Sequence, residues 1–306
     1  MLTMRHELSW SILQGMMPLI APWCCGTYRL PYQKRPLIMG ILNVTPDSFS
    51  DGGKYWGIRS AVGHARKMVL EGADIIDIGG ESTRPGATPV HAEEELCRVL
   101  PIVRALSSAL TVPLSIDTTK ASVARRAVEA GASIINDVSG GIRDPEMFPL
   151  AAESGAGLVI MHAKGTPQTM QKAPRYRNLM EEIVRFLSAQ FDRAMTCGIL
   201  KNRIVIDPGI GFGKTARHNL QVLNRLPLLE GLGLPILVGP SRKSFIGKAL
   251  HLPPTPSLIE RAEGTAAAVA IAVFQGARIL RVHDVAASVR IVRLVAAIQN
   301  ESVASP

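Results

Sequence analysis

Short, nearly continuous apolar runs alternate along this chain with longer segments in which apolar residues recur at helical spacing. The runs are Leu37–Leu42, Ile75–Ile78, Leu114–Ile116, Ile134–Ile135, Leu158–Met161, Ile204–Ile206, Ile236–Val238 and Ile279–Val282. Runs of this length without polar alternation are typical of strands in a parallel sheet that is buried on both faces. The pattern therefore predicts eight parallel strands.

The segments between the runs predict amphipathic helices. The clearest are Ser60–Glu71, Ala121–Ala130, Asn178–Cys197, Ala262–Phe274 and Ala286–Ile298. Glycine stands at or just beyond several of their ends, as expected at a helix C-terminus. Eight successive strand–helix units predict an α/β fold of one domain, a closed (β/α)8 TIM barrel. A doubly wound open sheet is the alternative, and periodicity alone does not exclude it.

A polar or glycine-rich cluster follows each of the eight runs. The clusters are Asn43–Thr45, Gly79–Arg84, Asp117–Thr119, Asn136–Asp137, His162, Asp207–Gly209, Gly239–Lys243 and Arg281–Asp284. The carboxyl ends of parallel strands share one face of a barrel, and barrels of this kind carry their active sites there. We therefore expect these clusters to converge on one site.

Composition supports a single barrel and narrows the partners. The chain has 306 residues, of which 47% are hydrophobic, and its formal net charge is +9. An α/β barrel takes roughly 250 residues, and no linker or charge run divides the chain. The positive charge favours an anionic partner. Because the basic residues are dispersed and form no aromatic-interleaved patch, nucleic acid is the weakest candidate.

Two further features concern the compartment. None of the four cysteines forms a C-x-x-C pair, so we expect neither a zinc site nor a disulfide framework. We expect the protein to reside in a reducing cytoplasm. Residues 8–21 are apolar but short, interrupted by Gly15 and Pro18, and followed by no signal-peptidase site, so we expect neither a signal peptide nor a membrane span. Residues 1–22 are interpreted as an N-terminal extension of unknown role, and a start at Met16 or Met17 stays open.

The motifs at the strand ends carry a resemblance to a known family. They read ILNVTPDSFSDGG (41–53), DIGGESTRPGA (77–87), SIDTTK (115–120), INDVSGG (135–141), DPGIGFGKT (207–215), GPSRKSFIG (239–247) and RVHDV (281–285). This ordered set, from about Trp23 to about Val285, resembles the dihydropteroate synthases. DPGIGFGKT is no Walker A loop, because Pro208 stands where that motif requires glycine.

The resemblance implies a pterin-binding catalytic barrel over residues 23–300. It implies an enzyme, a transferase that condenses (7,8-dihydropterin-6-yl)methyl diphosphate with 4-aminobenzoate to give 7,8-dihydropteroate and diphosphate for folate biosynthesis. The path would be dissociative and SN1-like. The protein must then stabilise positive charge on the pterin and negative charge on the departing diphosphate together. Mg²⁺ is the expected cofactor and sulfonamides the expected inhibitors. A homodimer through the late helices is also expected.

The resemblance assigns a pterin pocket. A carboxylate accepts two adjacent N–H groups of a pterin edge at once, which is the role of Asp207. Asn136 offers a donor and an acceptor, Asp117 lies near the ring, and Met161 packs on its face. Lys243 donates to the ring. Asp117 and Asp207 each follow a strand and precede a helix, so simple helix capping is the alternative for both.

The remaining substrate groups are assigned in the same way. The loop with Thr83 and Arg84, together with Phe212 and Ser244, would close the aminobenzoate pocket, with Phe49 and Pro85 as further lining. Ordinary loop packing is the alternative reading for these residues.

Arg281 and His283 stand two apart on the eighth strand and so share one side; they would bind the diphosphate. Asn43 would hold Mg²⁺, which bridges substrate phosphates and needs few protein ligands. We take Asp117, Lys243, Arg281 and His283 as catalytic. The alternative for Arg281 is a pair with Asp284 or a neighbouring carboxylate that only braces the barrel.

Two other functions stay open at this point. A pterin-binding barrel of corrinoid methyltransferases would share the pterin pocket but need no diphosphate site, and SRKS (241–244) and RVHD (281–284) favour the synthase. A non-catalytic pterin-binding scaffold would not need the charged set. The chain departs from the family in the fifth-strand loop, where Ala163 and Lys164 replace the more usual Met and Arg.

Overall fold

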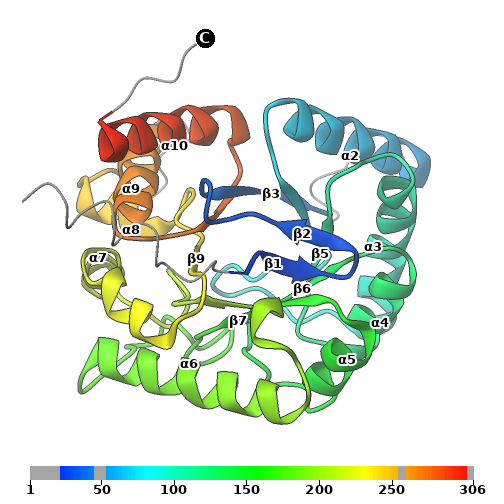
Figure 1. Ribbon diagram of the computed structural model, residues 1–306, viewed down its shortest axis with the longest axis horizontal. Coiled ribbons are helices and arrows are strands. Elements are labelled where there is room, and N and C mark those ends of the chain that lie inside the picture. The colour runs from blue at the N-terminus through cyan, green and yellow to red at the C-terminus, as the bar shows by residue number, and fades with distance from the viewer. Residues whose placement is uncertain (1–20, 45–52, 254–259, 302–306) are drawn as a thin grey trace, which may run out of the picture.

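The computed structural model describes residues 21–44, 53–253 and 260–301, and shows eight parallel strands ringed by helices (Figure 1). The strands are β3 (Leu37–Asn43), β4 (Ile75–Gly79), β5 (Leu114–Asp117), β6 (Ile134–Asp137), β7 (Gly157–Met161), β8 (Ile204–Asp207), β9 (Leu237–Val238) and β10 (Ile279–Val282). Each coincides with one predicted run, so all eight strand predictions are confirmed.

The sheet closes into a barrel. Its strand order is β8-β7-β6-β5-β4-β3-β10-β9. The two terminal strands of this order meet through a parallel bridge between Ile206 and Ile236, where the Ile206 amide donates to the Pro235 carbonyl at 3.0 Å. Closure leaves none of the eight described parallel strands with a free edge, which confirms the (β/α)8 barrel and excludes the open doubly wound sheet.

Helices follow the strands as predicted, and further ones appear. The helices are α2 (Gly53–Leu70), α3 (Ala92–Ser107), α4 (Ala121–Glu129), α5 (Met147–Ser154), α6 (Leu179–Thr196), α7 (Ala216–Asn224), α8 (Ser244–Ala249), α9 (Ala262–Phe274) and α10 (Val285–Asn300). The five predicted segments are α2, α4, α6, α9 and α10. The sequence pattern missed α3, which contains Pro101, and the shorter α5, α7 and α8.

Side chains alternate between the barrel interior and the helix layer along each strand. Ile38 and Leu42 of β3 pack outward into the cluster shared with the helices, whereas Leu37 and Met39 point inward. The inward cluster fills the amino-terminal end of the barrel with Leu37, Met39, Ile75, Ile134, Val159, Val205, Leu237 and Ile279. The strands are therefore held by apolar layers on both faces, as their composition required.

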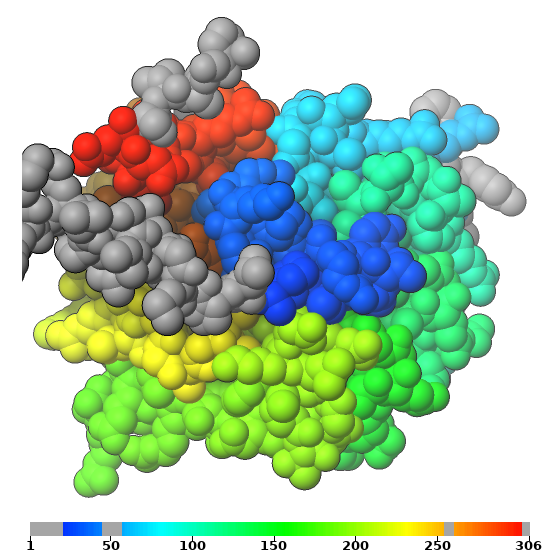
Figure 2. Space-filling model, in the orientation of Figure 1, coloured from blue at the N-terminus to red at the C-terminus, as the bar shows by residue number. Residues whose placement is uncertain are grey.

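A small hairpin that the sequence pattern did not predict covers the amino-terminal end of the barrel. Its strands are β1 (Trp23–Cys25) and β2 (Tyr28–Leu30), and it crosses the centre of the face seen in Figures 1 and 2. Trp23 is buried in the inward cluster, and its indole Nε1 donates to the Arg203 carbonyl at 2.9 Å. A Cβ at Gly157 would lie 2.5 Å from the Cys25 sulfur, so glycine permits this close approach.

The hairpin begins where the sequence placed the start of the barrel domain. Residues 1–20 of the expected extension, and Phe49 in the first-strand loop, lie outside the described residues. In the part of the chain that the structure describes, no helix combines the length and the apolar character that crossing a membrane requires.

Candidate active site

Five inward positions near the carboxyl ends of the strands are polar or charged. They are Asp77 on β4, Asp117 on β5, Asn136 on β6, Asp207 on β8 and Arg281 on β10. Four of them stand two residues after a side chain of the inward apolar cluster, and Asp117 stands two residues after the buried Ser115, so the period of two turns all five inward. The structure thus brings four predicted site residues, together with Asp77, to one end of the barrel.

Arg281 joins two of these carboxylates. Its Nε donates to Asp77 Oδ2 and its Nη2 to Asp117 Oδ2, both at 2.6 Å. The same Asp77 oxygen accepts from Asn136 Nδ2 at 3.2 Å. Asp284 does not take part, because its side chain caps α10 by accepting from the Ala287 amide. The alternative for Arg281 therefore holds as far as a carboxylate pair is concerned, but the partners are the strand residues Asp77 and Asp117 and not Asp284.

Burial and charge perturb this network. Burial raises the pKa of Asp117 to about 7, against the opposing effect of Arg281. Burial alone would lower the pKa of Arg281, but the carboxylates of Asp77 and Asp117 raise it above its usual value. Arg281 therefore stays cationic while Asp117 exchanges a proton near neutral pH, which is typical of functional sites.

Asp207 ends β8 with its carboxylate buried. Burial raises its pKa to about 6, partly offset by the Gly209 amide, which donates to Oδ1 at 2.6 Å. Gly209 has a φ of +71°, and any Cβ there would collide with the His162 carbonyl. Glycine is therefore required for the turn that supplies this hydrogen bond. Met161, the register partner of Asp207, is buried beside it.

Neither predicted carboxylate is a helix cap. The helix after β5 begins at Ala121 with Lys120 as its N-cap residue, and the helix after β8 is capped by Thr215. The Thr215 side chain accepts from the His218 amide at 3.1 Å. Asp117 and Asp207 are thus left for the pocket, and the capping alternative is wrong for both.

Lys243 lies across the ring of Phe212. Its Nζ is 4.3 Å from the ring centroid, and a Cβ at Gly211 would lie 3.0 Å from its Cδ. Gly211, with a φ of +86°, leaves room for the lysine stem. Burial and then the charge of Arg281 lower the pKa of Lys243 to about 8. The ammonium is therefore easily deprotonated for a lysine, yet remains a donor at pH 7.

His283 faces the same end of the barrel. Its Nδ1 is 3.0 Å from Ser241 Oγ, and the buried Val282 before it points the other way. Burial and the nearby Arg242, Arg281 and Lys243 lower its pKa to about 3, so the imidazole is neutral at pH 7. A neutral ring serves as a hydrogen-bond donor or acceptor and adds no charge of its own.

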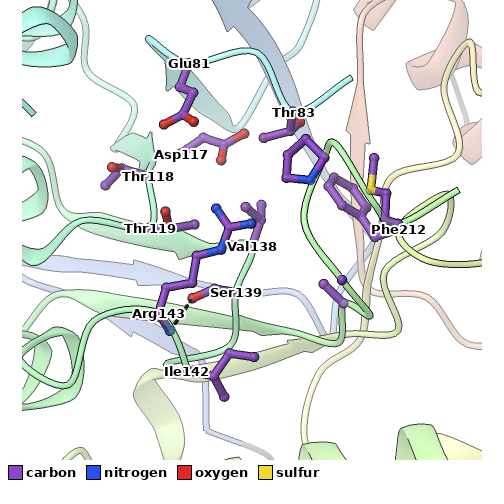
Figure 3. Close-up of a pocket in the computed structure, with 14 residues that line it drawn as sticks. Glu81, Thr83, Asp117, Thr118, Thr119, Val138, Ser139, Ile142, Arg143 and Phe212 are labelled. Carbon is purple, nitrogen blue, oxygen red and sulfur yellow. Dashed lines mark hydrogen bonds between the residues drawn. The ribbon is translucent and has the colours of Figure 1, made fainter. Parts of the chain in front are cut away.

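A pocket opens between the loops that follow β4 to β8 (Figure 3). It encloses about 550 Å³ of empty space including its mouth, and its lining includes Thr83, Asp117 and Phe212. Figure 3 shows Glu81 above Asp117 and the Arg143 side chain reaching in beside Val138. Three predicted substrate residues therefore line the pocket, and Lys243 adjoins it through Phe212.

The remaining predicted residues lie less centrally. Arg84 and Ser244 are exposed; Ser244 is the first residue of α8, directly after Lys243. Asn43 ends β3, which pairs with β10, so it adjoins the strand of Arg281 as expected. A Cβ at Gly79 would be 3.9 Å from Asn43 Oδ1 and 3.8 Å from Asp117 Oδ2. Gly79 thus keeps the space between these two oxygens open.

Lys214 is a buried residue near the pocket-lining Phe212 that the sequence reasoning did not single out. Its Nζ is 2.9 Å from His162 Nδ1 and donates to the carbonyls of His162 (3.3 Å) and Phe212 (3.1 Å). Burial lowers its pKa to about 7. The three acceptors match the three N–H groups of an ammonium. Lys214 therefore ties the loop after β7 to the loop after β8.

Asp77 and a second acidic cluster were also missed. Lys120 forms ion pairs with Glu81 and with the fully buried Glu95 beside the pocket. Asp77 carried a usable signal, since a carboxylate inside an apolar strand must have a buried partner. Glu95 and Lys120 carried none, because their contact joins different elements.

Lys164 braces its own loop. Its Nζ donates to the Arg175 carbonyl at 2.7 Å, pairs with Glu182 at 3.4 Å and lies 4.3 Å from the centroid of the Tyr176 ring. These contacts hold the loop after β7 against α6. The departure at Ala163 and Lys164 thus supplies a loop contact, and Ala163 lines the pocket.

Comparison with known proteins agrees with this geometry. A family model described as "Pterin binding enzyme" matches residues 39–283. The dihydropteroate synthase of Synechocystis sp. is 50% identical over 273 residues, covering 89% of this chain and 93% of that protein.

Two solved structures share the fold at high identity. The Yersinia pestis dihydropteroate synthase, in complex with a sulfonamide drug, has a TM-score of 0.83 and 45% identity over 90% of this chain and 98% of its own. The Xanthomonas albilineans enzyme with 4-aminobenzoic acid has a TM-score of 0.84 and 44% identity, and the match covers 94% of this chain and 100% of that chain. With the family match over most of its length, this chain belongs to the dihydropteroate synthases, a family of pterin-binding transferases.

Proposed function

We propose that this chain condenses (7,8-dihydropterin-6-yl)methyl diphosphate with 4-aminobenzoate, giving 7,8-dihydropteroate and diphosphate. The observation that carries the proposal is the pairing of opposite charges in one place. Two buried carboxylates, Asp117 and Asp207, share the barrel end with Lys243 and Arg281. A dissociative displacement needs this arrangement, because positive charge develops on the pterin while negative charge develops on the leaving group.

The pterin would lie over Asp207 and Asn136. Asp207 Oδ1 is engaged by the Gly209 amide, so the rest of the carboxylate is available to accept from the amino edge of the ring. Asn136 would face the opposite part of that edge. Met161 would pack beneath the ring, and Lys243 would donate to its carbonyl or N5. Asp117, near the reacting methylene, would stabilise the developing cation.

Arg281 and His283 would bind the departing diphosphate. The ion pairs of Arg281 use Nε and Nη2, and among the described residues no hydrogen bond engages Nη1. A guanidinium held in this way is preorganised, so little side-chain entropy is lost when Nη1 meets a phosphate oxygen. His283 would donate a neutral hydrogen bond, which strengthens as charge accumulates on the leaving group.

The residues near Asn43 fit a magnesium ion. The described residues contain no cluster of three or more His, Cys, Asp or Glu side chains suited to a metal. Mg²⁺ nevertheless needs only one or two protein oxygens when substrate phosphates supply others. Asn43 Oδ1, across the open space at Gly79 from Asp117, offers such an oxygen. When bound, Mg²⁺ would neutralise charge on the diphosphate.

4-Aminobenzoate would enter between the loops after β4 and β8. Thr83 and Phe212 line the pocket there, and Lys243 Nζ lies over the Phe212 ring. Arg84 and Ser244, at the exposed rim, would contact its carboxylate end. The related Xanthomonas structure holds 4-aminobenzoic acid and the related Yersinia structure a sulfonamide drug, which supports both as ligands of this chain.

The assembly proposed for the chain is a cytoplasmic homodimer. Exposed apolar side chains gather on the last two helices of the barrel: Ile271 and Phe274 on α9, and Leu294 and Ile298 on α10. These helices pack on each other, so their outer faces form a surface that a second copy would cover. Sedimentation equilibrium tests this proposal, and a monomer at micromolar concentration would contradict it.

A turnover assay with the pterin diphosphate, Mg²⁺ and 4-aminobenzoate tests the activity. Formation of dihydropteroate supports the synthase. Pterin binding without turnover indicates a binding scaffold, and methyl transfer from a methylated folate to a corrinoid indicates the related methyltransferases. A sulfonamide should inhibit competitively against 4-aminobenzoate, most strongly with diphosphate present, and purely non-competitive inhibition would contradict the shared pocket.

A further inference from the structure

Asp77 lies beneath the pocket and has no role in the proposed reaction. Its side chain is fully buried on the inward face of β4. One oxygen, Oδ2, accepts from both Arg281 Nε and Asn136 Nδ2, at 2.6 Å and 3.2 Å. The other, Oδ1, has no partner among the described residues. A single oxygen therefore holds one residue proposed for the pterin and one proposed for the diphosphate.

This contact fixes the direction of the Asn136 amide. An asparagine amide presents a donor on one side and an acceptor on the other, and it can turn over to exchange them. An ionised carboxylate only accepts, so Asp77 requires Nδ2 to face it. Asn136 Oδ1 then faces away from Asp77. The group that meets Oδ1 must be a donor, such as a ring N–H or an exocyclic amino group.

The same oxygen keeps Arg281 in place when Asp117 is engaged by a ligand. Arg281 is held from two sides, by Asp117 at the pocket and by Asp77 below it. Asp117 lines the pocket and is shared with whatever binds there, whereas Asp77 is fully buried. Asp77 is therefore the partner whose contact does not change as a ligand enters.

We propose that Asp77 is a positioning residue that sets the donor–acceptor direction of Asn136 and the aim of Arg281. This inference rests on the proposed function, because it takes the pterin and the diphosphate as the ligands of those two residues. A positioning role differs from a purely structural role in a measurable way. If Asp77 were only structural, its replacement would affect stability and leave ligand selectivity unchanged.

The first test is Asp77→Leu, with Asp74→Leu as its matched control. Asp74 also pairs with an arginine, Arg35, but outside the pocket before β4. In Asp77→Leu no oxygen remains to accept from Arg281 Nε and Asn136 Nδ2, so nothing fixes the direction of the Asn136 amide. The dissociation constant for a pterin without diphosphate should rise about tenfold or more. The KM for 4-aminobenzoate should stay within about twofold.

The second test is the conservative variant Asp77→Asn. Its amide oxygen can stand where Oδ2 stands and accept from both Arg281 Nε and Asn136 Nδ2, while its NH₂ takes the place of Oδ1. The direction of Asn136 is then kept, so pterin affinity should lie within about threefold of the native value. If Asp77→Leu is too unstable to purify, Asp77→Asn is compared directly with the native protein.

The outcomes are distinct. If native turnover is absent, the proposed function fails. If native turnover is present but Asp77→Leu lowers only the melting temperature, as Asp74→Leu should, Asp77 is a structural residue. A folded Asp77→Asn variant that loses pterin affinity by about tenfold or more would contradict the assigned direction of Asn136. Selective loss of pterin affinity in Asp77→Leu, with affinity retained in Asp77→Asn, supports the proposal.

Discussion

The two ends of the barrel are built from the same strands and the same inward-facing positions, yet they differ in chemistry. At the amino-terminal end the inward residues are apolar, such as Ile75, Ile134 and Ile279, and the β1–β2 hairpin seals them. Two residues further along the same strands stand Asp77, Asn136 and Arg281. One end is filled and closed, while the other is charged and open.

The difference shows where stability and function are separated in this fold. Burying apolar side chains stabilises the closed end by about 25 cal/mol per Å². Burying carboxylates and lysines at the open end costs free energy, which appears as the raised pKa of Asp207 and the lowered pKa of Lys214. The free energy gained at the apolar end therefore offsets the cost of burying charged groups at the polar end. Four predictions test this division, beginning with the largest effect.

Trp23→Ala should lower the stability contributed by the closed end and leave ligand binding at the open end unchanged. The indole is buried between the hairpin and the barrel, and truncation removes its packing and its hydrogen bond to Arg203. The free energy of unfolding should fall by about 3–5 kcal/mol. Urea denaturation measures this, and the KM values of the folded fraction should not change. A change in pterin affinity without loss of stability would contradict the separation of the two ends.

Asp207→Asn should lower pterin affinity at the open end without lowering the stability of the fold. The Gly209 amide holds the oxygen of the new side chain, so its NH₂ faces the donors of the pterin edge. A lost charge-assisted hydrogen bond and a buried donor without a partner should cost about 2–4 kcal/mol of pterin affinity. Calorimetry on the folded variant measures it. Because a buried carboxylate is removed, the melting temperature should hold or rise, and unchanged affinity would remove Asp207 from the site.

Two arginines compare the ends directly. Arg281→Ala should weaken binding of free diphosphate and of the pterin diphosphate by about 2 kcal/mol, as expected for a charged hydrogen bond. A pterin without diphosphate should lose less affinity. Arg35→Ala removes an exposed pair with Asp74 and should cost about 0–1 kcal/mol of stability and no affinity. If Arg281→Ala weakens all ligands alike, Arg281 only braces the barrel.

The pH dependence should have opposite signs for stability and for binding. Burial raises the pKa of Asp207 from 3.8 to about 6, so the folded state keeps this proton to a higher pH than the unfolded chain. Its contribution to the free energy of unfolding therefore falls as pH rises from 3.8 to about 6. Pterin binding needs the carboxylate, so affinity should weaken by up to about tenfold per pH unit below that pKa.

The difference between the native protein and Asp207→Asn isolates both effects, because the amide does not titrate. Thermal denaturation and calorimetry at matched pH values measure them. Equal pH profiles in the two proteins would show that Asp207 is not the group responsible.

Much of the site was readable from the strand ends. The runs that precede Asp117 and Asp207, and the run that contains Arg281, indicated both the strands and the phase of their inward residues, since a period of two leaves only two directions. Asp77 lay within another run, Ile75–Ile78, and was not assigned. Its partners could not be read from the pattern, because Arg281 lies 204 positions away along the chain.

The sequence by itself determined the eight strands, their parallel arrangement and the end at which the polar residues gather, because these depend on local hydrophobic pattern and on the motifs. Only the tertiary structure decided that the sheet closes between β8 and β9, and that a hairpin of two three-residue strands seals one end. It also decided that Asp77 joins Arg281 to Asn136, and that Lys214 joins two loops. Such contacts depend on the directions of side chains from distant elements, and no local pattern encodes them.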